Sequence, residues 1–399
     1  MPLNLMKFTF LKKQKIILIT NSAWNVYNFR MKLIEYLAEA GYDVLVLAPQ
    51  DKYSAAIQKL EFCRLHHLKH LAPLGANPYK DLRFLYELYT IIRREKPGTI
   101  LSFTIKPNIM GSIVANVLQV PIIPTVTGLG YSFLHKSWLN WIVRSLYKFA
   151  FQAVEKVAFH NQSDYELLKS LKILQPGQGV VVGGSGVDTD HFSTTYLPRK
   201  QPFVFLFLGR MLYDKGLVEL VAAATRIRKN NPGVQFWVAG SHQAEHPDAI
   251  DKNLLQQWIK KGTIKYFGQV EDVRPLIAKA HVVVLPSYRE GMPRSVLEAM
   301  SMGRPVIATN VPGCRDAVRA GWNGWLVEPR NAAQLESSLH QALQQNYSFL
   351  QQMGLNGREL AQTRFDLHTV QNQYINLLHA LNYLHAEAST APAESAAVF

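Results

Sequence analysis

The sequence has only two cysteines and no long apolar run, and both scarcities narrow the class of protein. Cys63 and Cys314 lie far apart in the 399 residues, and neither belongs to a Cys-x-x-Cys or Cys/His ligand pattern. Neither a disulfide framework nor a structural zinc site is therefore supported. No segment approaches the roughly 18 to 20 apolar residues that a membrane-spanning helix needs. We expect a protein of a reducing, cytoplasmic setting.

Acidic residues are also scarce, at 29 Asp and Glu against 43 Lys and Arg, which gives a net charge of +14. Such an excess suits anionic partners, which include nucleic acids, phosphate-bearing metabolites and the anionic face of a membrane. The basic residues are dispersed, and the sequence contains no Arg-rich stripe or recognisable nucleic-acid-binding motif. A nucleic acid is therefore not an expected partner, and a basic nucleic-acid-binding protein is only the alternative interpretation from another functional class.

Short runs of β-branched residues alternate with amphipathic stretches along most of the chain. This alternation is typical of parallel sheets covered by helices, and so predicts an α/β fold. The runs are 15–20, 43–49, 99–103, 120–126 and 179–184, followed by 203–209, 234–240, 263–268, 281–287, 304–309 and 324–329.

The rhythm restarts after the polar, proline-containing segment 193–202, which we expect to be a hinge. Two doubly wound, Rossmann-like domains are predicted, at residues 1–192 and 203–365, since one hydrophobic core rarely serves a chain of this length. Segment 366–385 predicts a C-terminal helix that could pack back on the first domain, and 387–399 is expected to be a disordered tail. Ligands of such sheets bind beyond the carboxyl ends of the strands, so the cleft between the domains is the expected site.

Two glutamates lie eight residues apart after one of these buried runs. Glu290 falls in the turn before a helix that Pro293 can start, and Glu298 lies on that helix. Both carboxylates can accept hydrogen bonds from sugar hydroxyls, and the N–H groups of the first helical turn form a ready anion site. Taken singly, the two acids have an ordinary alternative explanation, in which Glu290 caps the helix and Glu298 is a solvated helical side chain.

Basic residues follow another predicted strand, in FLGRMLYDKG at 207–216. Gly209 and Arg210 end the strand, and Lys215 leads into the next helix. A diphosphate leaving group needs its charge neutralised, which Arg does through a planar fork and Lys through a compact point charge. In isolation, an Arg and a Lys in a loop are more often solvated surface residues.

The longer strings around these residues resemble a known family. The text PSYREGMPRSVLEAMSMGRPVIAT at 286–309 resembles the E-x7-E element of the retaining glycosyltransferases of the GT-B fold, specifically family 4. Gly313 to Asp316 matches the family's downstream G-x-x-[DE], and 207–216 matches its G-R-x4-K-G diphosphate clamp. YFGQVEDV at 266–273 resembles the loop that reads the nucleotide base. The resemblance is dense over roughly residues 180 to 330 and elsewhere extends only to the fold-level pattern.

The resemblance implies a donor site and a separate role for each of its main residues. Arg210 and Lys215 would neutralise the donor diphosphate, Glu290 would orient the hydroxyls of the donor sugar, and these three residues are the catalytic candidates. Transfer with retention is implied, and a front-face route is the working hypothesis because no candidate nucleophile stands out. The predicted donor-binding residues are Gly209, Arg210, Lys215, Gln269, Val270, Glu290, Gly291, Met292, Pro293 and Glu298.

The first half of the chain departs from the family pattern. The usual Gly-Gly turn after the first strand is missing, and Thr127 stands about where the family's histidine is expected. FTIKPNIMGS at 103–112 and VTGLGYSF at 126–133 resemble a subgroup that adds N-acetylhexosamine, notably α-1,3-linked N-acetylgalactosamine, to sugars on undecaprenyl diphosphate. In the alternative interpretation, Lys106 is solvated and the glycines only shape turns. The acceptor-side candidates are Asn25, Lys106, Asn108, Thr127 and Gly128.

No metal or other cofactor is expected. Asp188 and Asp190 form a D-x-D pair, which in another glycosyltransferase class holds a divalent cation. Here the pair falls in GSGVDTDHF at 184–192, which resembles the family's element at the domain junction, so metal binding is the lesser interpretation. The histidines at 66, 67 and 70 lack a nearby carboxylate or cysteine, and a solvated face explains them better.

The segment WLNWIVRSLYKFAF at 138–151 predicts a helix with two open interpretations. Its apolar residues are explained by packing on the sheet, while its Trp, Tyr, Lys and Arg residues fit an interfacial helix on anionic lipid. The expected partners are a sugar nucleotide, with uridine diphosphate suggested by the subgroup resemblance, a polyprenyl-diphosphate-linked acceptor and an anionic membrane surface. The expected location is cytoplasmic, peripheral on the inner face of the plasma membrane.

Other activities of the same fold stay open as alternatives, namely a sugar-nucleotide epimerase or a phosphorylase. A nicotinamide-dependent dehydrogenase is disfavoured, because TGLGYS at 127–132 lacks the third glycine of the dinucleotide fingerprint and follows the wrong strand.

Overall fold

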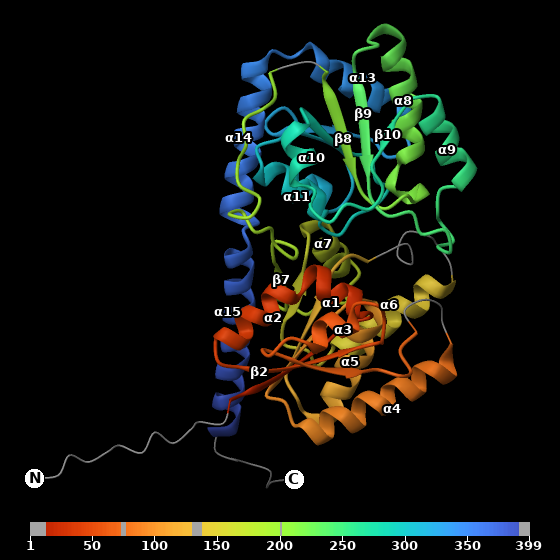
Figure 1. The fold of residues 1–399 in the computed structure, drawn as a ribbon. Coiled ribbons are helices and arrows are strands. Elements are labelled where there is room, and N and C mark those ends of the chain that lie inside the picture. Colours follow the sequence, from red (N-terminus) through yellow and green to blue (C-terminus); the bar gives the residue numbers. More distant parts are fainter. Residues whose placement is uncertain (1–12, 73–76, 130–137, 200–201, 391–399) are drawn as a thin grey trace, which may run out of the picture.

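Two parallel sheets, each covered by helices on both faces, make up the protein (Figure 1). The computed structural model describes residues 13–72, 77–129, 138–199 and 202–390. The α/β prediction of two doubly wound units is confirmed. Both sheets are parallel because each strand is followed by a helical crossover, and their central strands are buried along their whole length.

The first sheet has seven strands in the order β3-β2-β1-β4-β5-β6-β7. The chain starts in its middle and winds outward on both sides, so the strand order reverses between β1 and β4. The strands are β1 (Lys15–Ile19), β2 (Asp43–Ala48), β3 (Arg64–His67), β4 (Thr99–Phe103), β5 (Ile122–Val126), β6 (Val157–Phe159) and β7 (Gly179–Val181).

The second sheet has six strands in the order β10-β9-β8-β11-β12-β13, with its reversal between β8 and β11. Ligands of doubly wound sheets bind outside such reversals, at the carboxyl ends of the strands. The strands are β8 (Val204–Leu208), β9 (Gln235–Ala239), β10 (Lys265–Tyr266), β11 (Val282–Leu285), β12 (Val306–Thr309) and β13 (Gly324–Val327).

Each predicted run contains a strand, but the sequence pattern missed two short ones. The edge strand β3 reads Arg-Leu-His-His and is only partly buried, so it shows no apolar run. β6 is fully buried but has only three residues, which is too short for a periodic signal.

Helices cover both sheets, and several begin at residues that the sequence marks as caps. In α4, the side chain of Asn77 accepts a hydrogen bond from the Lys80 amide, and Pro78 occupies the first helical position. Those of the first unit are α1 (Ala23–Phe29), α2 (Met31–Glu39), α3 (Ser54–Gln58), α4 (Pro78–Glu95), α5 (Ile105–Leu118), α6 (Trp138–Phe151) and α7 (Gln162–Ser170). Later in the chain come the 3₁₀ turn η2 (Tyr213–Lys215), α8 (Leu217–Asn230), α9 (Lys252–Lys260), α10 (Arg274–Lys279), α11 (Arg294–Ser301), α12 (Cys314–Ala317), α13 (Ala332–Gln344), α14 (Tyr347–Arg364) and α15 (Leu367–Thr390).

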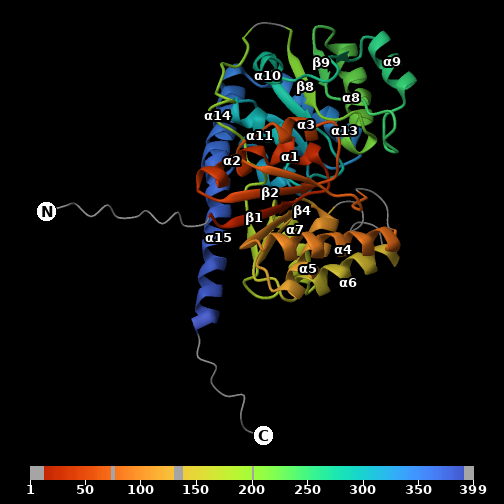
Figure 2. The same cartoon turned by 60° about the horizontal axis from the view of Figure 1, so that its bottom comes forward.

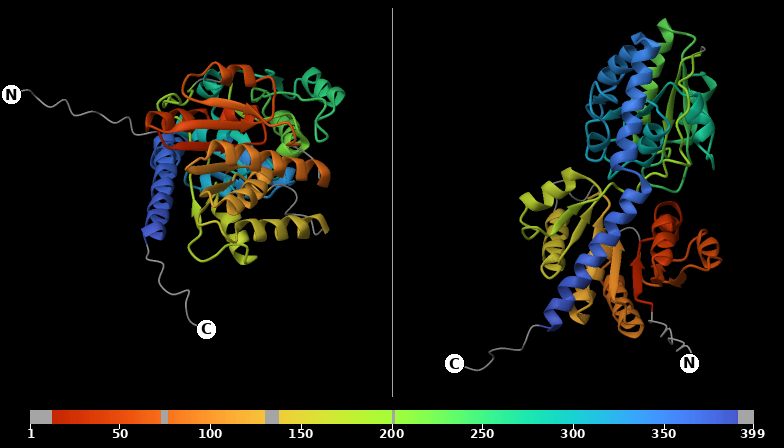
Figure 3. Two further views of the ribbon diagram at one scale, coloured as in Figure 1. Left: turned by 90° about the horizontal axis from the view of Figure 1, so that it is seen from below. Right: turned by 90° about the vertical axis from the view of Figure 1, so that its left-hand side faces the viewer.

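The two C-terminal helices connect the units a second time. α14 packs on α11 of the second unit, and α15 then runs along the first unit, as the right-hand view of Figure 3 shows. Val370, Tyr374 and Leu378 of α15 belong to a hydrophobic cluster with residues of β1, β2 and β4. The Tyr374 hydroxyl lies 3.2 Å from Oγ1 of Thr125. The last helix therefore completes the core of the first unit.

The tail predicted to be disordered from residue 387 needs a correction. α15 continues to Thr390. Its end contains Ala and Glu residues, which are good helix formers, so the helix extends into the segment that composition alone assigned to the tail. Residues 391–399 lie outside the described part of the chain.

The segment proposed as a hinge is attached to the second unit where it is described. The fully buried guanidinium of Arg304 donates hydrogen bonds to the carbonyl oxygens of Thr195 and Tyr196, at 2.8 and 3.1 Å. The hinge at 193–202 stays a prediction. Across the described ranges, no helix combines the length and the apolar character needed to cross a bilayer.

Candidate functional site

A cavity of about 820 Å³ lies between the carboxyl ends of the two sheets. The second unit supplies most of its lining, and Trp24, Asn28 and Phe29 of α1 supply the opposite wall. Nine of the ten predicted donor-binding residues line it, and these are Gly209, Arg210, Lys215, Gln269, Val270, Glu290, Met292, Pro293 and Glu298. Residues that are up to 89 positions apart in the sequence, from Gly209 to Glu298, are thus brought to one place.

Lys215 and Glu290 form an ion pair inside this cavity. Nζ of Lys215 lies 2.6 Å from Oε1 of Glu290, and both side chains are 14% exposed. Burial works against the charge of Lys215, but the Glu290 carboxylate outweighs it and raises the pKa of the ammonium above its ordinary value. The lysine therefore carries a full positive charge at neutral pH.

Gly216 explains how Lys215 comes so close to the loop after β11. Gly216 has φ of +70°, a conformation that glycine adopts without strain. A Cβ atom at this position would overlap the carbonyl oxygen of Pro286. The turn that carries Lys215 therefore packs directly on the segment that leads to Glu290.

Glu298 is held by a neighbour that the sequence reasoning did not single out. Nε of Arg294 lies 2.9 Å from Oε1 of Glu298, one helical turn away on α11. Burial raises the pKa of Glu298 to about 6, and the positive charge of Arg294 limits the increase. The i,i+4 spacing of an Arg and a Glu on a predicted helix was the available signal. Arg294 also donates a hydrogen bond to the carbonyl oxygen of Asn28 and so spans the cleft.

Arg210 and the loop after β10 form the other side of the cavity. Arg210 follows β8, and no acidic side chain of the described residues forms an ion pair with it. Gln269 and Val270 follow β10, whose loop is fixed by a hydrogen bond from the Gly240 amide to the Gly268 carbonyl at 2.7 Å. A guanidinium without an acidic partner at the end of a strand is suited to an anionic ligand.

Gly291, the tenth predicted donor residue, lies in the contact between the two units and is not among the residues that line the cavity. A Cβ atom on Gly291 would overlap the carbonyl oxygen of Thr127, and one on Gly128 would lie 3.3 Å from Cα of Gly291. Nδ2 of Asn161 donates a hydrogen bond of 2.8 Å to the Gly291 carbonyl. Close backbone approach to the first unit therefore explains why this position is a glycine, and its place among the donor-binding residues stays a prediction.

A buried ion pair holds the same loop. Nη2 of Arg289 lies 3.0 Å from Oδ1 of Asp164 in α7, with side chains 9% and 1% exposed. Burial raises the pKa of Asp164 and lowers that of Arg289, because it penalises both charged forms. The loop that carries Glu290 is thus fixed by the first unit on either side of the glutamate.

The acceptor-side candidates occupy different environments. Lys106, Thr127 and Gly128 line a smaller cavity of about 200 Å³ together with Asn21 and Thr104. Nζ of Lys106 lies 2.8 Å from Oδ1 of Asp81, so the interpretation of a simply solvated lysine is wrong.

Asn108 is fully buried, and its side chain bonds Oγ of Ser102 at 2.9 Å and the Thr125 carbonyl at 2.8 Å. Its prediction as an acceptor residue is therefore wrong, because both ends of its amide connect β4 to β5. Asn25 is partly buried on α1 and lines neither of these two cavities.

A histidine that sequence reasoning missed lies beyond β6. His160 is 5% exposed, and its amide donates to the Val126 carbonyl at 3.1 Å, next to Thr127 where the family's histidine was expected. Burial, and to a smaller extent the charge of Arg30, hold the pKa of His160 well below its ordinary value. The ring is therefore neutral at physiological pH. Its place on a strand that the pattern missed explains why it was overlooked.

The possible metal ligands are dispersed. Oδ1 of Asp188 accepts a hydrogen bond from the His191 amide at 2.8 Å and so closes a turn. Nε2 of His67 lies 3.0 Å from the side-chain nitrogen Nε2 of Gln58. Within the described residues, no three His, Cys, Asp or Glu side chains are arranged to hold a metal ion. Metal independence stays a prediction.

Comparison with known families gives two matches. Residues 15–161 match the glycosyl transferase 4-like family, and residues 202–345 match glycosyl transferases group 1. The first match contains β1 to β6, and the second contains all six strands of the second sheet.

Individual proteins are similar over most of the chain. An N,N'-diacetylbacillosaminyl-diphospho-undecaprenol alpha-1,3-N-acetylgalactosaminyltransferase of Campylobacter jejuni is 25% identical over 82% of this chain and 88% of its own. A UDP-Gal:alpha-D-GlcNAc-diphosphoundecaprenol alpha-1,3-galactosyltransferase of Escherichia coli is 27% identical over 62% of this chain and 67% of its own. The solved structure of sucrose-phosphate synthase from Thermosynechococcus elongatus superimposes with a TM-score of 0.77, at 21% identity, over 93% of this chain and all of that one.

Proposed function

We propose that this chain, which belongs to the glycosyltransferases by its match to the 4-like family in its first half and to group 1 in its second half, extends a lipid-linked saccharide with an N-acetylhexosamine. The donor is a uridine diphosphate sugar, for example one that carries N-acetylgalactosamine. The acceptor is a sugar on a polyprenyl diphosphate, in the assembly of a surface polysaccharide or glycan. The observation that carries the proposal is the gathering of nine predicted donor residues around the Lys215–Glu290 ion pair in one cavity.

The donor diphosphate lies between Arg210 and Lys215 in this proposal. Lys215 has three N–H donors and can hold Glu290 and a phosphate oxygen at the same time, and Arg210 can offer a bidentate fork. The amides at the start of α11, after Pro293, add further positive potential. Glu298 accepts hydrogen bonds from the ribose hydroxyls, and Gln269 and Val270 contact the base.

The chemical step proceeds with retention by a front-face route. The bond between the anomeric carbon and the diphosphate oxygen breaks, while the acceptor oxygen bonds the same face of that carbon. The acceptor's proton passes to the departing diphosphate oxygen, so no protein nucleophile is needed. Arg210 and Lys215 stabilise the charge that develops on the leaving group, and Glu290 fixes the hydroxyls of the donor sugar.

The acceptor side is supported by the names of two relatives. Both the Campylobacter and the Escherichia coli enzymes act on sugars linked through diphosphate to undecaprenol. The 200 Å³ cavity around Lys106 and Gly128 lies beside the donor loop, because Gly128 contacts Gly291. An acceptor sugar bound there would face the donor. Such an acceptor requires the protein to work at a membrane surface, as a peripheral protein on the inner face of the plasma membrane.

The test is a donor screen scored by release of nucleoside diphosphate, with and without undecaprenyl-linked acceptor. Release that needs both the acceptor and an N-acetylhexosamine donor supports the proposal, and nuclear magnetic resonance of the product gives its anomeric configuration. The same screen with added chelator tests metal independence. A sugar nucleotide altered without acceptor would identify an epimerase, and transfer from a sugar phosphate would identify a phosphorylase; either result would replace this proposal.

A further inference from the structure

Exposed apolar side chains gather on three neighbouring helices of the first unit. Ten large hydrophobic residues of the described chain are exposed, and six of them lie on α4, α5 and α6. Tyr86 and Trp141 are 71% and 72% exposed. The six are Tyr79, Leu82 and Tyr86 of α4, Val117 of α5, and Trp141 and Phe149 of α6.

These side chains face outward from helices whose other faces are already packed. Phe84 and Leu88 of α4 and Tyr147 and Phe151 of α6 are buried in the core of the first unit. Tyr79, Leu82 and Tyr86 follow one another at intervals of three and four, so they share one helical face. The core therefore does not account for the exposed residues, and packing on the sheet explains only the buried face of α6.

The three helices form one surface, defined here as the α4–α6 face. α5 packs against α4 on one side and α6 on the other. Figure 2 shows the three helices side by side on the same flank of the first unit. A single partner can therefore contact the exposed side chains of all three helices.

Positive charge accompanies the apolar residues on this face. α6 contains no Asp or Glu, and Lys148 is exposed next to Phe149. On α4, Lys80 and Arg83 are exposed, and the guanidinium of Arg83 stacks over the ring of Tyr79 at 4.4 Å. No ion pair of the described residues includes Lys80, Arg83 or Lys148.

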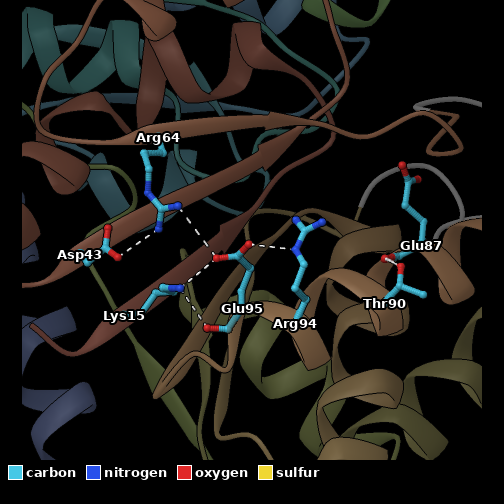
Figure 4. A network of polar contacts seen from close by, with 7 residues as sticks. All are labelled: Lys15, Asp43, Arg64, Glu87, Thr90, Arg94 and Glu95. Atoms are coloured by element: carbon cyan, nitrogen blue, oxygen red, sulfur yellow. Dashed lines mark hydrogen bonds and ion pairs between the residues drawn. The ribbon is translucent and has the colours of Figure 1, made fainter. Parts of the chain in front are cut away.

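The acidic residues of α4, in contrast, are engaged elsewhere. Asp81 pairs with Lys106, and the Glu87 carboxylate accepts hydrogen bonds from the amides of Lys69 and His70. Glu95 lies among the basic groups of Lys15, Arg64 and Arg94 (Figure 4). The free charges on the face are therefore mostly positive.

We propose that the α4–α6 face docks the protein on a bilayer of anionic lipid. Tyr and Trp side chains are suited to the headgroup region, where their rings meet acyl chains and their polar atoms meet water. Lys and Arg beside them are attracted to anionic headgroups, at about a fivefold gain in binding for each residue. Exposed aromatic and basic side chains lie together on both α4 and α6, which is the pairing that an anionic membrane interface favours.

The docked orientation places the acceptor cavity beside the lipid. α5 begins at Ile105, next to Thr104 and Lys106 of the 200 Å³ cavity, and Leu71 and Gly128 of the same cavity flank the segments that lead into α4 and α6. A polyprenyl chain embedded next to the face would present its diphosphate sugar at this end. The identity of that acceptor rests on the proposed function, whereas lipid binding does not.

The experiment is cosedimentation of the full chain with two kinds of vesicle, one of phosphatidylcholine alone and one that also contains about 30 mol% of the anionic lipid phosphatidylglycerol. Binding is expected only to the anionic vesicles and is expected to weaken strongly in high salt. The variant Tyr86→Ser/Trp141→Ser/Phe149→Ser should bind at least tenfold more weakly. The matched control, Tyr196→Ser/Phe349→Ser, removes exposed aromatic residues outside the face and should bind like the wild type.

Three results would overturn the inference: no binding of the wild type to anionic vesicles, equal binding of the triple variant, or equal loss in the control. Loss of self-association in the triple variant, with vesicle binding unchanged, would instead assign the face to a second copy of the chain. Transfer to a short, water-soluble acceptor tests the proposed function independently of docking, because the triple variant should keep that activity. A chain that binds vesicles but transfers no sugar would contradict the proposed function and leave the docking inference standing.

Discussion

Nζ of Lys215 and Oε1 of Glu290 lie 2.6 Å apart, which joins the residue assigned to the leaving group to the one assigned to the donor sugar. The contact links η2, the short turn that follows β8, to the loop after β11. Each side chain fixes the other, so the positive charge and the carboxylate keep a constant separation. A donor that bridges them is held on both sides of the bond that breaks.

Replacing Glu290 by Gln is expected to lower kcat by about 100-fold or more while the Kd for uridine diphosphate changes little. The amide has one oxygen acceptor in place of two and so loses a hydrogen bond from a sugar hydroxyl, but that oxygen can still accept the hydrogen bond from Lys215 and keep this lysine and Arg210 in place for the diphosphate. Steady-state kinetics and calorimetric titration with the nucleotide measure the two effects. Glu336→Gln, at a distant ion pair with Arg226, is the control, and near-normal turnover of Glu290→Gln would contradict the assignment.

Glu298 should make nucleotide binding and stability depend on pH in opposite ways. The raised pKa of about 6 means that the carboxyl is neutral below that pH and accepts hydrogen bonds less well, so the Kd for the donor should rise as pH falls through 6. Glu298→Gln should bind weakly at every pH, with no such inflection. A wild-type Kd that is constant from about pH 5 to about pH 7, one unit either side of the titration, would disprove this.

The stability effect has the reverse sign. Because the pKa of Glu298 rises from 4.5 to about 6 on folding, the contribution of this group is favourable below 4.5 and is lost as pH rises through 6. The change corresponds to about 2 kcal/mol. Glu298→Gln should therefore have a higher Tm than the wild type at pH 8 and an equal one at pH 4, with the exposed Glu359→Gln as control.

Gly291→Ala is expected to reduce activity at least tenfold without unfolding the chain. The added methyl group would overlap the Thr127 carbonyl oxygen, so the donor loop must move away from the first unit. Gly233→Ala is the matched control, because nothing lies within 4 Å of its Cβ position and its φ is not positive. Circular dichroism checks the fold, and unchanged turnover of Gly291→Ala would show that the close approach is not needed for catalysis.

Asn108→Ala is expected to destabilise the protein by about 1–3 kcal/mol, because the Thr125 carbonyl and the Ser102 hydroxyl lose a buried partner. The KM for the acceptor should not change, since the amide is fully buried. Denaturant unfolding and acceptor kinetics on the folded variant measure the two quantities. A raised KM at unchanged stability would restore Asn108 to the acceptor site.

The site residues that could be predicted from the sequence are those that follow a strand closely. Arg210, Lys215 and Glu290 each follow a buried run, so once the strands are assigned, the parallel sheet brings them together. The contacts that join the two units, such as that of Arg294 with Asn28, depend on how the units are placed against each other. No local pattern encodes that placement.

Errors in the sequence prediction have the same origin. Asn108 follows a strand as a ligand-binding residue would, but its amide is buried against the sheet and connects β4 to β5. The close approach of the Gly291 backbone to Thr127 was likewise not encoded in the local sequence. His160 follows β6, which is too short to be found by periodicity. In each case a tertiary contact decided what the residue does.

The return of α15 to the first unit also affects the order in which the protein can finish folding during synthesis. Val370, Tyr374 and Leu378 cover apolar residues of β1, β2 and β4 but leave the ribosome only after the whole of the second sheet. At the usual rate of 5 to 20 residues per second, the nascent first unit waits roughly 10 to 40 s for this cover. During that interval it exposes an apolar surface of its sheet, and surfaces of this kind are prone to aggregation until they are covered.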